Sequence, residues 1–142
     1  MSSVDKLSGY IMINNVLFSI IESPSHPNFS ALYTRLGFEE QRYDSVRKAI
    51  SALKQHHPAV VVAEFFYGYG NNYAGVNISN LDVFLYSLQK YAPTAKVIVL
   101  VEKEERQFVE KLASLFELHA VLVLPLPGVE MERVLREGIL AG

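Results

Sequence analysis

Runs of branched apolar residues alternate with helical segments along the whole chain, and this alternation limits the fold more than any other feature of the sequence. Four runs are apolar almost without interruption: NVLFSIIE at 15–22, AVVVAE at 59–64, KVIVLV at 96–101 and AVLVL at 120–124. Such runs are typical of strands that are covered on both faces, as in a parallel sheet. The short polar segment EEQRY at 39–43 predicts a further strand, at an edge of the sheet.

Helical periodicity fills the intervals between these strands. Apolar residues recur on one helical face in the segments 26–38, 44–57, 79–91, 104–116 and 130–140. Asp44 or Ser45 is expected to cap the second helix, and Ser79 or Asn80 the third. Because crossovers between parallel strands are right-handed, the pattern predicts an α/β fold: a doubly wound five-stranded parallel sheet, order 2-1-3-4-5, with helices on both faces.

The composition is typical of one soluble globular domain. The chain has 142 residues, 50% of them hydrophobic and 20% charged, so we expect a single domain over 1–142 with a loose tail at 1–9. The net charge of −2 gives no broad reason to expect nucleic acid or a membrane as a partner. The absence of cysteine excludes disulfides, thiolate catalysis and cysteine-ligated zinc. With no signal peptide or membrane-spanning run recognised, the expected location is the cytoplasm.

Two glutamates are predicted at the crevice where sheets of this kind bind ligands. Glu22 ends the first strand and Glu64 ends the third. Ligands bind outside the carboxyl ends of the strands, at the point where the strand order reverses, so both side chains should face the same crevice. Glu64 is either a solvated strand end or part of a site, and the fold alone does not decide between these interpretations.

The order and spacing of four longer segments resemble those of one known family. NVLFSIIESP corresponds to its first strand and acidic pair, and LGFEEQRYDSVRKAISALKQHHPAVVVAE to the run from its first helix to its phosphoacceptor strand. APTAKVIVLV and LHAVLVLPLP resemble its fourth and fifth strands. The family is the receiver domain of bacterial two-component response regulators, and the resemblance covers the chain from about Asn15 to Leu140. It implies a receiver-like, flavodoxin-like fold and a role in signal transduction.

The residues that this family uses for phosphotransfer are replaced. The family requires an aspartate nucleophile, an acidic pair that holds magnesium, a hydroxyl on the fourth strand and a lysine after the fifth. In our alignment Glu64 stands at the nucleophile's position, and Glu22 alone represents the acidic pair. The hydroxyl position is Val101, the lysine position is Leu126, and Pro127 matches the proline after that lysine. Since lysine and metal neutralise charge on the transferred phosphoryl group, their loss predicts a pseudo-receiver that is not an enzyme and uses no metal or cofactor.

An unusual loop follows the third strand. The segment between Glu64 and the next helix is about eight residues longer than the family's usual spacing, and long irregular loops in compact domains are often functional. It is rich in tyrosine, glycine and asparagine, a composition that is common at recognition surfaces. The candidate partner-binding residues are Tyr67, Tyr69, Asn71, Asn72 and Tyr73. The alternative is that this loop merely covers the crevice.

Two classes of function therefore remain open. The first is a signalling or scaffolding module that binds a partner protein, or a second copy of itself, without phosphorylation. The second is a flavodoxin-like domain that binds a nucleotide or flavin in the crevice. The segment SPSHPN offers Ser23, Ser25 and Asn28 for a phosphate, but its prolines lack the N–H donors that such a site needs.

Overall fold

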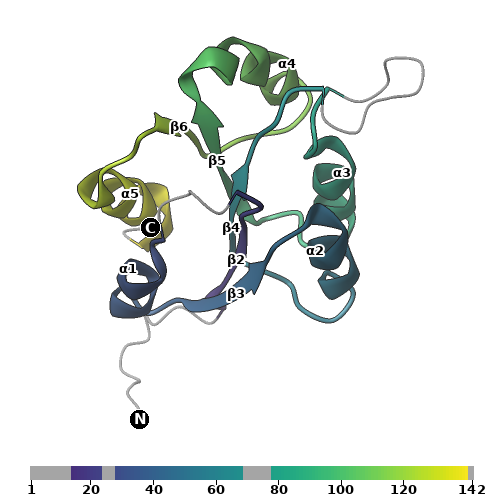
Figure 1. Cartoon of the computed structure of the whole chain (residues 1–142). Coiled ribbons are helices and arrows are strands. Elements are labelled where there is room, and N and C mark those ends of the chain that lie inside the picture. The colour runs from purple at the N-terminus through teal and green to yellow at the C-terminus, as the bar shows by residue number, and fades with distance from the viewer. Residues whose placement is uncertain (1–13, 24–27, 69–77, 141–142) are drawn as a thin grey trace.

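A five-stranded parallel sheet runs through the centre of the molecule (Figure 1). The computed structural model describes residues 14–23, 28–68 and 78–140. The strands lie in the order β3-β2-β4-β5-β6, which is 2-1-3-4-5 in order of sequence, so the predicted fold class is confirmed. The tail expected at 1–9 lies outside the described residues. The strands are β2 (Val16–Ile20), β3 (Glu39–Tyr43), β4 (Val60–Glu64), β5 (Lys96–Glu102) and β6 (Ala120–Leu124).

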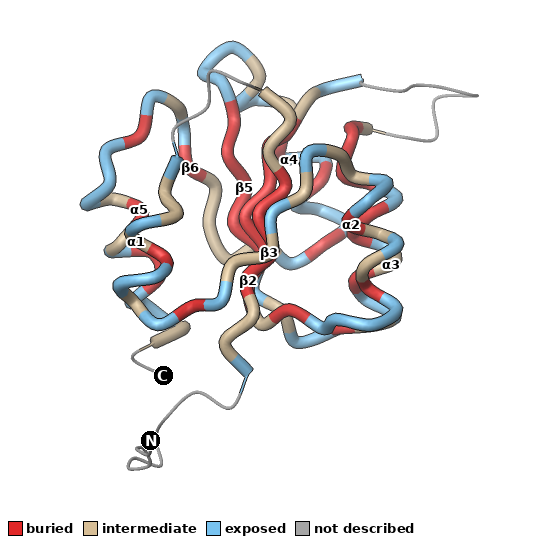
Figure 2. Tube along the Cα trace, turned by 60° about the horizontal axis from the view of Figure 1, so that its bottom comes forward, coloured by how far each residue is buried: buried red, intermediate tan, exposed pale blue. Residues whose placement is uncertain are grey.

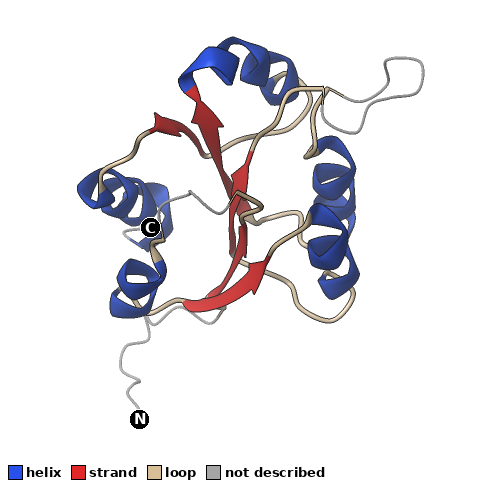
Figure 3. Cartoon of the chain, in the orientation of Figure 1, coloured by secondary structure: helices blue, strands red, loops and turns tan. Residues whose placement is uncertain are grey.

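Helices cover both faces of this sheet (Figure 3). The helices α1 and α5 share one face with the core around Leu17 and Ile98, and α2, α3 and α4 share the other with the core around Phe18 and Val99. Arg35 Nη2 lies 2.9 Å from Glu132 Oε1 and so joins α1 to α5. The helices are α1 (Ser30–Arg35), α2 (Val46–Ala52), α3 (Asp82–Tyr91), a 3₁₀ segment η2 (Lys103–Phe108), α4 (Val109–Ala113), α5 (Gly128–Leu135) and a kinked continuation η3 (Arg136–Leu140).

The central strands are apolar throughout because successive side chains enter different cores. In β4, Val60 and Val62 pack toward α1 and α5, whereas Val61 and Ala63 pack toward α2 and α3. All of β4 is buried. Figure 2 shows the buried residues in red at the centre of the molecule. At the edge, β3 has only exposed and half-buried residues, which confirms the polar edge strand expected at 39–43.

The helix boundaries agree with the sequence in one place and differ in others. Ser45 caps α2, since its Oγ accepts the N–H of Lys48 at 3.2 Å. The helix expected over 104–116 begins instead as the 3₁₀ segment η2, none of whose residues is buried; α4 starts only at Val109, where side chains enter the core. The last helix ends earlier than expected, because the chain leaves helical geometry at Glu137 and Gly138 has φ of +78°. Within the described residues, no helix has the length and apolar character to cross a bilayer.

Candidate functional site

The two predicted carboxylates meet at the carboxyl edge of the two central strands. Strand β2 pairs with β3 on one side and with β4 on the other, so the strand order reverses between β2 and β4. Glu64 is the last residue of β4, and Glu22 follows the end of β2. The N–H of Glu22 donates to Glu64 Oε1 at 2.7 Å. The structure therefore brings the two residues together, as the sequence predicted.

Glu64 is buried and hydrogen-bonded, so the interpretation of a solvated strand end is wrong. Its residue is only 4% exposed, and Oε1 also accepts the N–H of Ser23 at 3.0 Å. Glu64 accepts these bonds because β2 ends here. The last hydrogen bond between β2 and β3 runs from the N–H of Ile21 to the carbonyl of Tyr43. The next two N–H groups have left the sheet and need an acceptor, because an unpaired buried donor is costly. The carboxylate of Glu64 supplies it.

The charge around this edge is predominantly negative. Burial raises the pKa of Glu22, and the nearby charges of Glu64 and Asp44 raise it further, whereas a hydrogen bond from the main chain of Val46 opposes the rise. Asp44 pairs with Lys48, 2.9 Å away, and this partner lowers the pKa of Asp44. In the described part of the chain, no group of three or more acidic or histidine side chains is placed to hold a metal ion.

The other three aligned positions are Val101, Leu126 and Pro127. Two of them are buried apolar residues, and the third caps a helix. Val101 is 1% exposed and packs in the core shared by α3 and α4. Leu126 follows β6 after Pro125 and packs in the opposite core, and Pro127 is the N-cap of α5. Strand β6 itself ends at Leu124, which pairs with Glu102 in β5. The last residue of the strand is therefore a leucine, like Leu126. Whichever leucine is compared with the lysine of receivers, its side chain provides neither a cation nor a hydroxyl.

A second carboxylate holds the far end of the segment that follows β2. Glu40 on β3 accepts the hydroxyl of Ser19 at 2.6 Å and the hydroxyl of Ser30, the first residue of α1, at 2.5 Å. Arg42 Nη1 lies 3.5 Å from the same carboxylate. Burial and the charge of Glu40 raise the pKa of the nearby Tyr33. Sequence analysis did not identify this cluster, because isolated serines and an edge glutamate form no recognisable motif.

The base of the long loop is closed by hydrogen bonds. Asn80 and Phe66 bond reciprocally: the N–H of Asn80 donates to the carbonyl of Phe66 at 3.1 Å, and the N–H of Phe66 to Asn80 Oδ1 at 2.7 Å. Asn80 Nδ2 also donates to the carbonyl of Glu64 at 2.9 Å. The N–H of Gly68 donates to the carbonyl of Ile78 at 2.8 Å. The two ends of the loop are therefore adjacent.

The start of α3 differs from the predicted cap. The N-cap is Leu81, not Ser79 or Asn80. The carboxylate of Asp82, which is 2% exposed, accepts the N–H groups of Ile78 at 2.8 Å and Ser79 at 2.7 Å. Ser79 Oγ donates to the same carboxylate and accepts the N–H of Leu81. The signal for this arrangement is the three-residue spacing of Ser79 and Asp82, which resembles a capping box.

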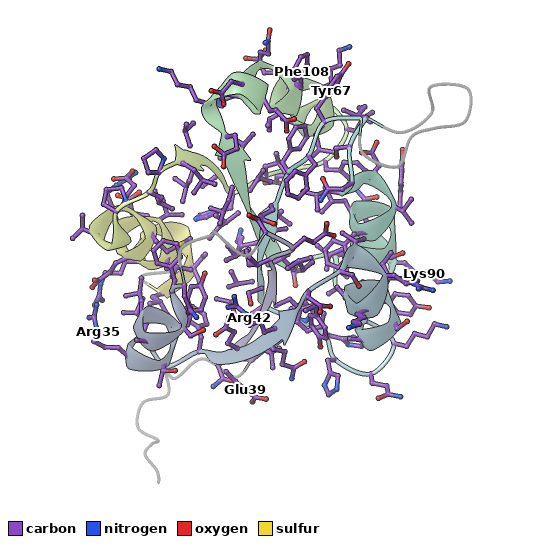
Figure 4. The ribbon with its side chains drawn as sticks, in the orientation of Figure 1. Arg35, Glu39, Arg42, Tyr67, Lys90 and Phe108 are labelled. Carbon is purple, nitrogen blue, oxygen red and sulfur yellow. The ribbon has the colours of Figure 1, made fainter. Side chains whose placement is uncertain are left out.

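Tyr67 attaches the loop to the connection between β5 and α4. Its ring stacks on Phe108, and the centroids are 3.7 Å apart. Figure 4 labels the two side chains, which come from different segments. The N–H of Tyr67 donates to Glu105 Oε1 at 3.0 Å. Tyr67 is still 42% exposed. The other candidate residues of the loop, Tyr69, Asn71, Asn72 and Tyr73, lie outside the described residues.

The residues considered for a phosphate group are already engaged where the structure describes them. The N–H of Ser23 donates to Glu64, and Asn28 Oδ1 accepts the N–H of Ser30 at 2.8 Å. Ser25 lies outside the described residues. A nucleotide or flavin in this crevice stays a prediction that the structure does not test.

Comparison with solved structures identifies the fold. A response regulator receiver domain protein from Clostridium thermocellum matches with a TM-score of 0.67 and 15% identity, over 87% of this chain and 93% of the other. The signal receiver domain of a putative Luxo repressor protein from Vibrio parahaemolyticus matches with a TM-score of 0.63 and 12% identity, over 87% and 88%. The chain has the receiver fold. At these identities the similarity is one of fold.

The same fold also occurs in a structure described as an enzyme. Adenylate cyclase from Rhodopirellula baltica matches with a TM-score of 0.65 and 12% identity, over 89% of this chain and 88% of the other. No family model matches the sequence, and no curated protein matches it either. The receiver fold of this chain is thus established by its structure.

Removing the carboxylate of Glu64 should destabilise the protein. We expect Glu64→Ala to lower the free energy of unfolding by about 2–4 kcal/mol, because two main-chain N–H donors lose their acceptor. Glu64→Gln keeps one oxygen acceptor and should lose about half as much. Urea unfolding followed by circular dichroism measures both. Glu110→Ala, an exposed change on α4, is the control, and equal midpoints for Glu64→Ala and this control would show that the hydrogen bonds contribute nothing.

Neutralising Glu22 should make the protein slightly more stable near neutral pH. The pKa of Glu22 is raised in the folded state above its ordinary value of 4.5, mainly by burial. The folded protein therefore holds this proton more tightly than the unfolded chain, and the associated stability is lost as the pH rises through the folded-state pKa. We expect Glu22→Gln to match the wild type at low pH and to exceed it by about 0.5 kcal/mol or less at pH 7. Thermal midpoints across this range test it, with Glu110→Gln as control; a variant that is less stable at pH 7 refutes it.

Proposed function

We propose that this protein is a non-catalytic signalling module of the bacterial cytoplasm, which uses a receiver fold to bind a partner protein without phosphoryl transfer. The observation that carries the proposal is the state of Glu64. Its side chain stands at the end of β4, where the alignment places the phosphoacceptor, and Oε1 accepts two main-chain N–H groups. The carboxylate at this position therefore has a structural role, because it holds the main chain that follows β2.

Phosphoryl transfer at this edge would meet two obstacles. An attacking carboxylate must reach the phosphorus atom, but Glu64 is 4% exposed. The charge that develops on the phosphoryl oxygens must also be neutralised, usually by a metal ion and a cation. Here Glu22 adds negative charge beside Glu64, and Val101, Leu124 and Leu126 provide no cation. These features favour a protein with one signalling state.

We propose that the long loop after β4 provides the surface that binds the partner protein. Its base is fixed to the body of the domain through Asn80, Asp82 and the stacked pair of Tyr67 and Phe108. Tyr67 keeps a substantial exposed area, and tyrosine gives a large contact surface for little loss of side-chain freedom. We assign the partner-binding role to Tyr67, Tyr69, Asn71, Asn72 and Tyr73.

The protein should not accept a phosphoryl group. After incubation with acetyl phosphate and Mg²⁺, we expect its intact mass to be unchanged, because Val101 and Leu126 stand where receivers carry the hydroxyl and the lysine that stabilise the transferred charge. Glu64→Asp should also stay unmodified, since it restores only the nucleophile. A functional receiver domain treated in parallel shows that the reagent is active. A stable gain of one phosphoryl group on the wild-type chain, with amide shifts at Glu22 and Glu64, would refute the proposal.

Shortening the loop should remove partner binding and leave the fold intact. Gly68 and Ile78 are joined by a hydrogen bond, so a short glycine–asparagine turn can replace residues 69–77 without moving either end. We expect a thermal midpoint within a few degrees of the wild type and the loss of proteins that co-purify with the tagged full chain from its native host. Tyr86→Ala, a change at an exposed tyrosine on α3, is the control and should keep them. Retention of the same proteins by the shortened chain would place the binding surface elsewhere.

A further inference from the structure

A hollow of about 370 Å³ lies at the opposite end of the sheet from Glu64. Its walls come from the last turns of α3, the loop from α3 into β5, the start of β5 and the segment between α4 and β6. Val97, near the start of β5, is part of the lining, whereas Glu64 pairs with Leu100 farther along that strand. The hollow is therefore separate from the crevice between β2 and β4.

The floor of the hollow is apolar and belongs to the protein core. Its lining includes Leu88 on α3, Ala92 at the C-cap of α3, Val97 on β5 and Phe116 after α4, and each is less than 9% exposed. The ring of Phe116 meets that of Tyr86 edge-on, with the centroids 4.8 Å apart, so its orientation is fixed by packing. Such a floor favours an apolar, preferably aromatic, ligand.

The rim has balanced charge. Lys96 and Glu117 both line the hollow and are exposed, and their opposite charges offset each other. The described residues include no ion pair that involves either side chain within the 4.0 Å limit for salt bridges. A ligand with a net charge would be attracted by one of the two and repelled by the other. The rim therefore favours a ligand without net charge.

The end of α3 supplies hydrogen-bond acceptors at this place. The last carbonyl groups of a helix have no partner within the helix, and Pro93 has no N–H to give to the carbonyl of Gln89. His119 also lines the hollow, but its ring faces α5, where Nε2 lies 3.2 Å from the carbonyl of Val134. The carbonyl groups at the end of α3 suit a ligand that donates an N–H.

We propose that this hollow binds a small uncharged aromatic molecule that carries an N–H donor. Its volume lies at the lower end of the range of about 300–1,000 Å³ that is usual for ligand sites, which suits one or two fused rings. The ring lies on the floor formed by Leu88, Val97 and Phe116, and the N–H faces the end of α3. This site is independent of the partner-binding role of the loop.

Titration with indole tests the site and its chemistry in the full-length protein. We expect saturable amide shifts in ¹⁵N-resolved spectra, centred on Leu88, Val97 and His119. N-methylindole, which lacks the N–H, should bind at least fivefold more weakly, as should the anion indole-3-acetate and the cation tryptamine. The absence of saturable shifts for indole, or shifts centred on Glu22 and Glu64, overturns the proposal. Equal or tighter binding of either charged compound overturns the assignment of an uncharged ligand.

A matched pair of substitutions tests the location. Ala92→Leu places three further carbon atoms in the hollow and should weaken indole binding at least tenfold. Ala113→Leu makes the same change at an exposed position on α4 outside the hollow and should leave it unchanged. If Ala92→Leu alters amides throughout the protein, Gln89→Phe, at the exposed rim, serves in its place with the same expected loss. Unchanged indole affinity in the filling variant overturns the site.

Discussion

The carboxylate of Glu64 and the two N–H groups that it accepts determine how the centre of this structure can be used. The chain leaves the sheet after β2, and the freed donors of Glu22 and Ser23, which are half-buried, need an acceptor. A charged acceptor is stronger than a neutral one. Glu64 supplies it from the end of β4, a strand that pairs with β2.

The segment between β2 and α1 is held in this way at both ends. Glu64 holds its start, and Glu40 holds the first residue of α1 and the buried hydroxyl of Ser19. Both carboxylates come from strands that flank β2, one on each side. Each carboxylate thus ties a described end of this connection to a strand beside β2.

Features that depend on local sequence were predictable. The strands follow from their apolar runs, the polar edge strand from EEQRY, and the cap of α2 from Ser45. The meeting of Glu22 and Glu64 followed from the general rule for the edge of a doubly wound sheet.

Features that depend on tertiary contacts were not predictable. The burial of Glu64 depends on the direction of two N–H groups that are remote in sequence, and a periodicity pattern contains no such information. The 3₁₀ form of η2 and the stack of Tyr67 on Phe108 likewise arise from how segments meet in space. Asp82 is an intermediate case. Its three-residue spacing from Ser79 can be read from the sequence, but its burial cannot.

The closed base of the long loop separates the demands of folding from those of recognition. Gly68 and Ile78 are joined directly, and the side chains of Asn80 and Asp82 satisfy the neighbouring main-chain groups. These closing contacts are made by residues outside the segment 69–77, so they set no requirement on its length or composition. The position is therefore suited to carry a grafted epitope or a peptide library on the same scaffold.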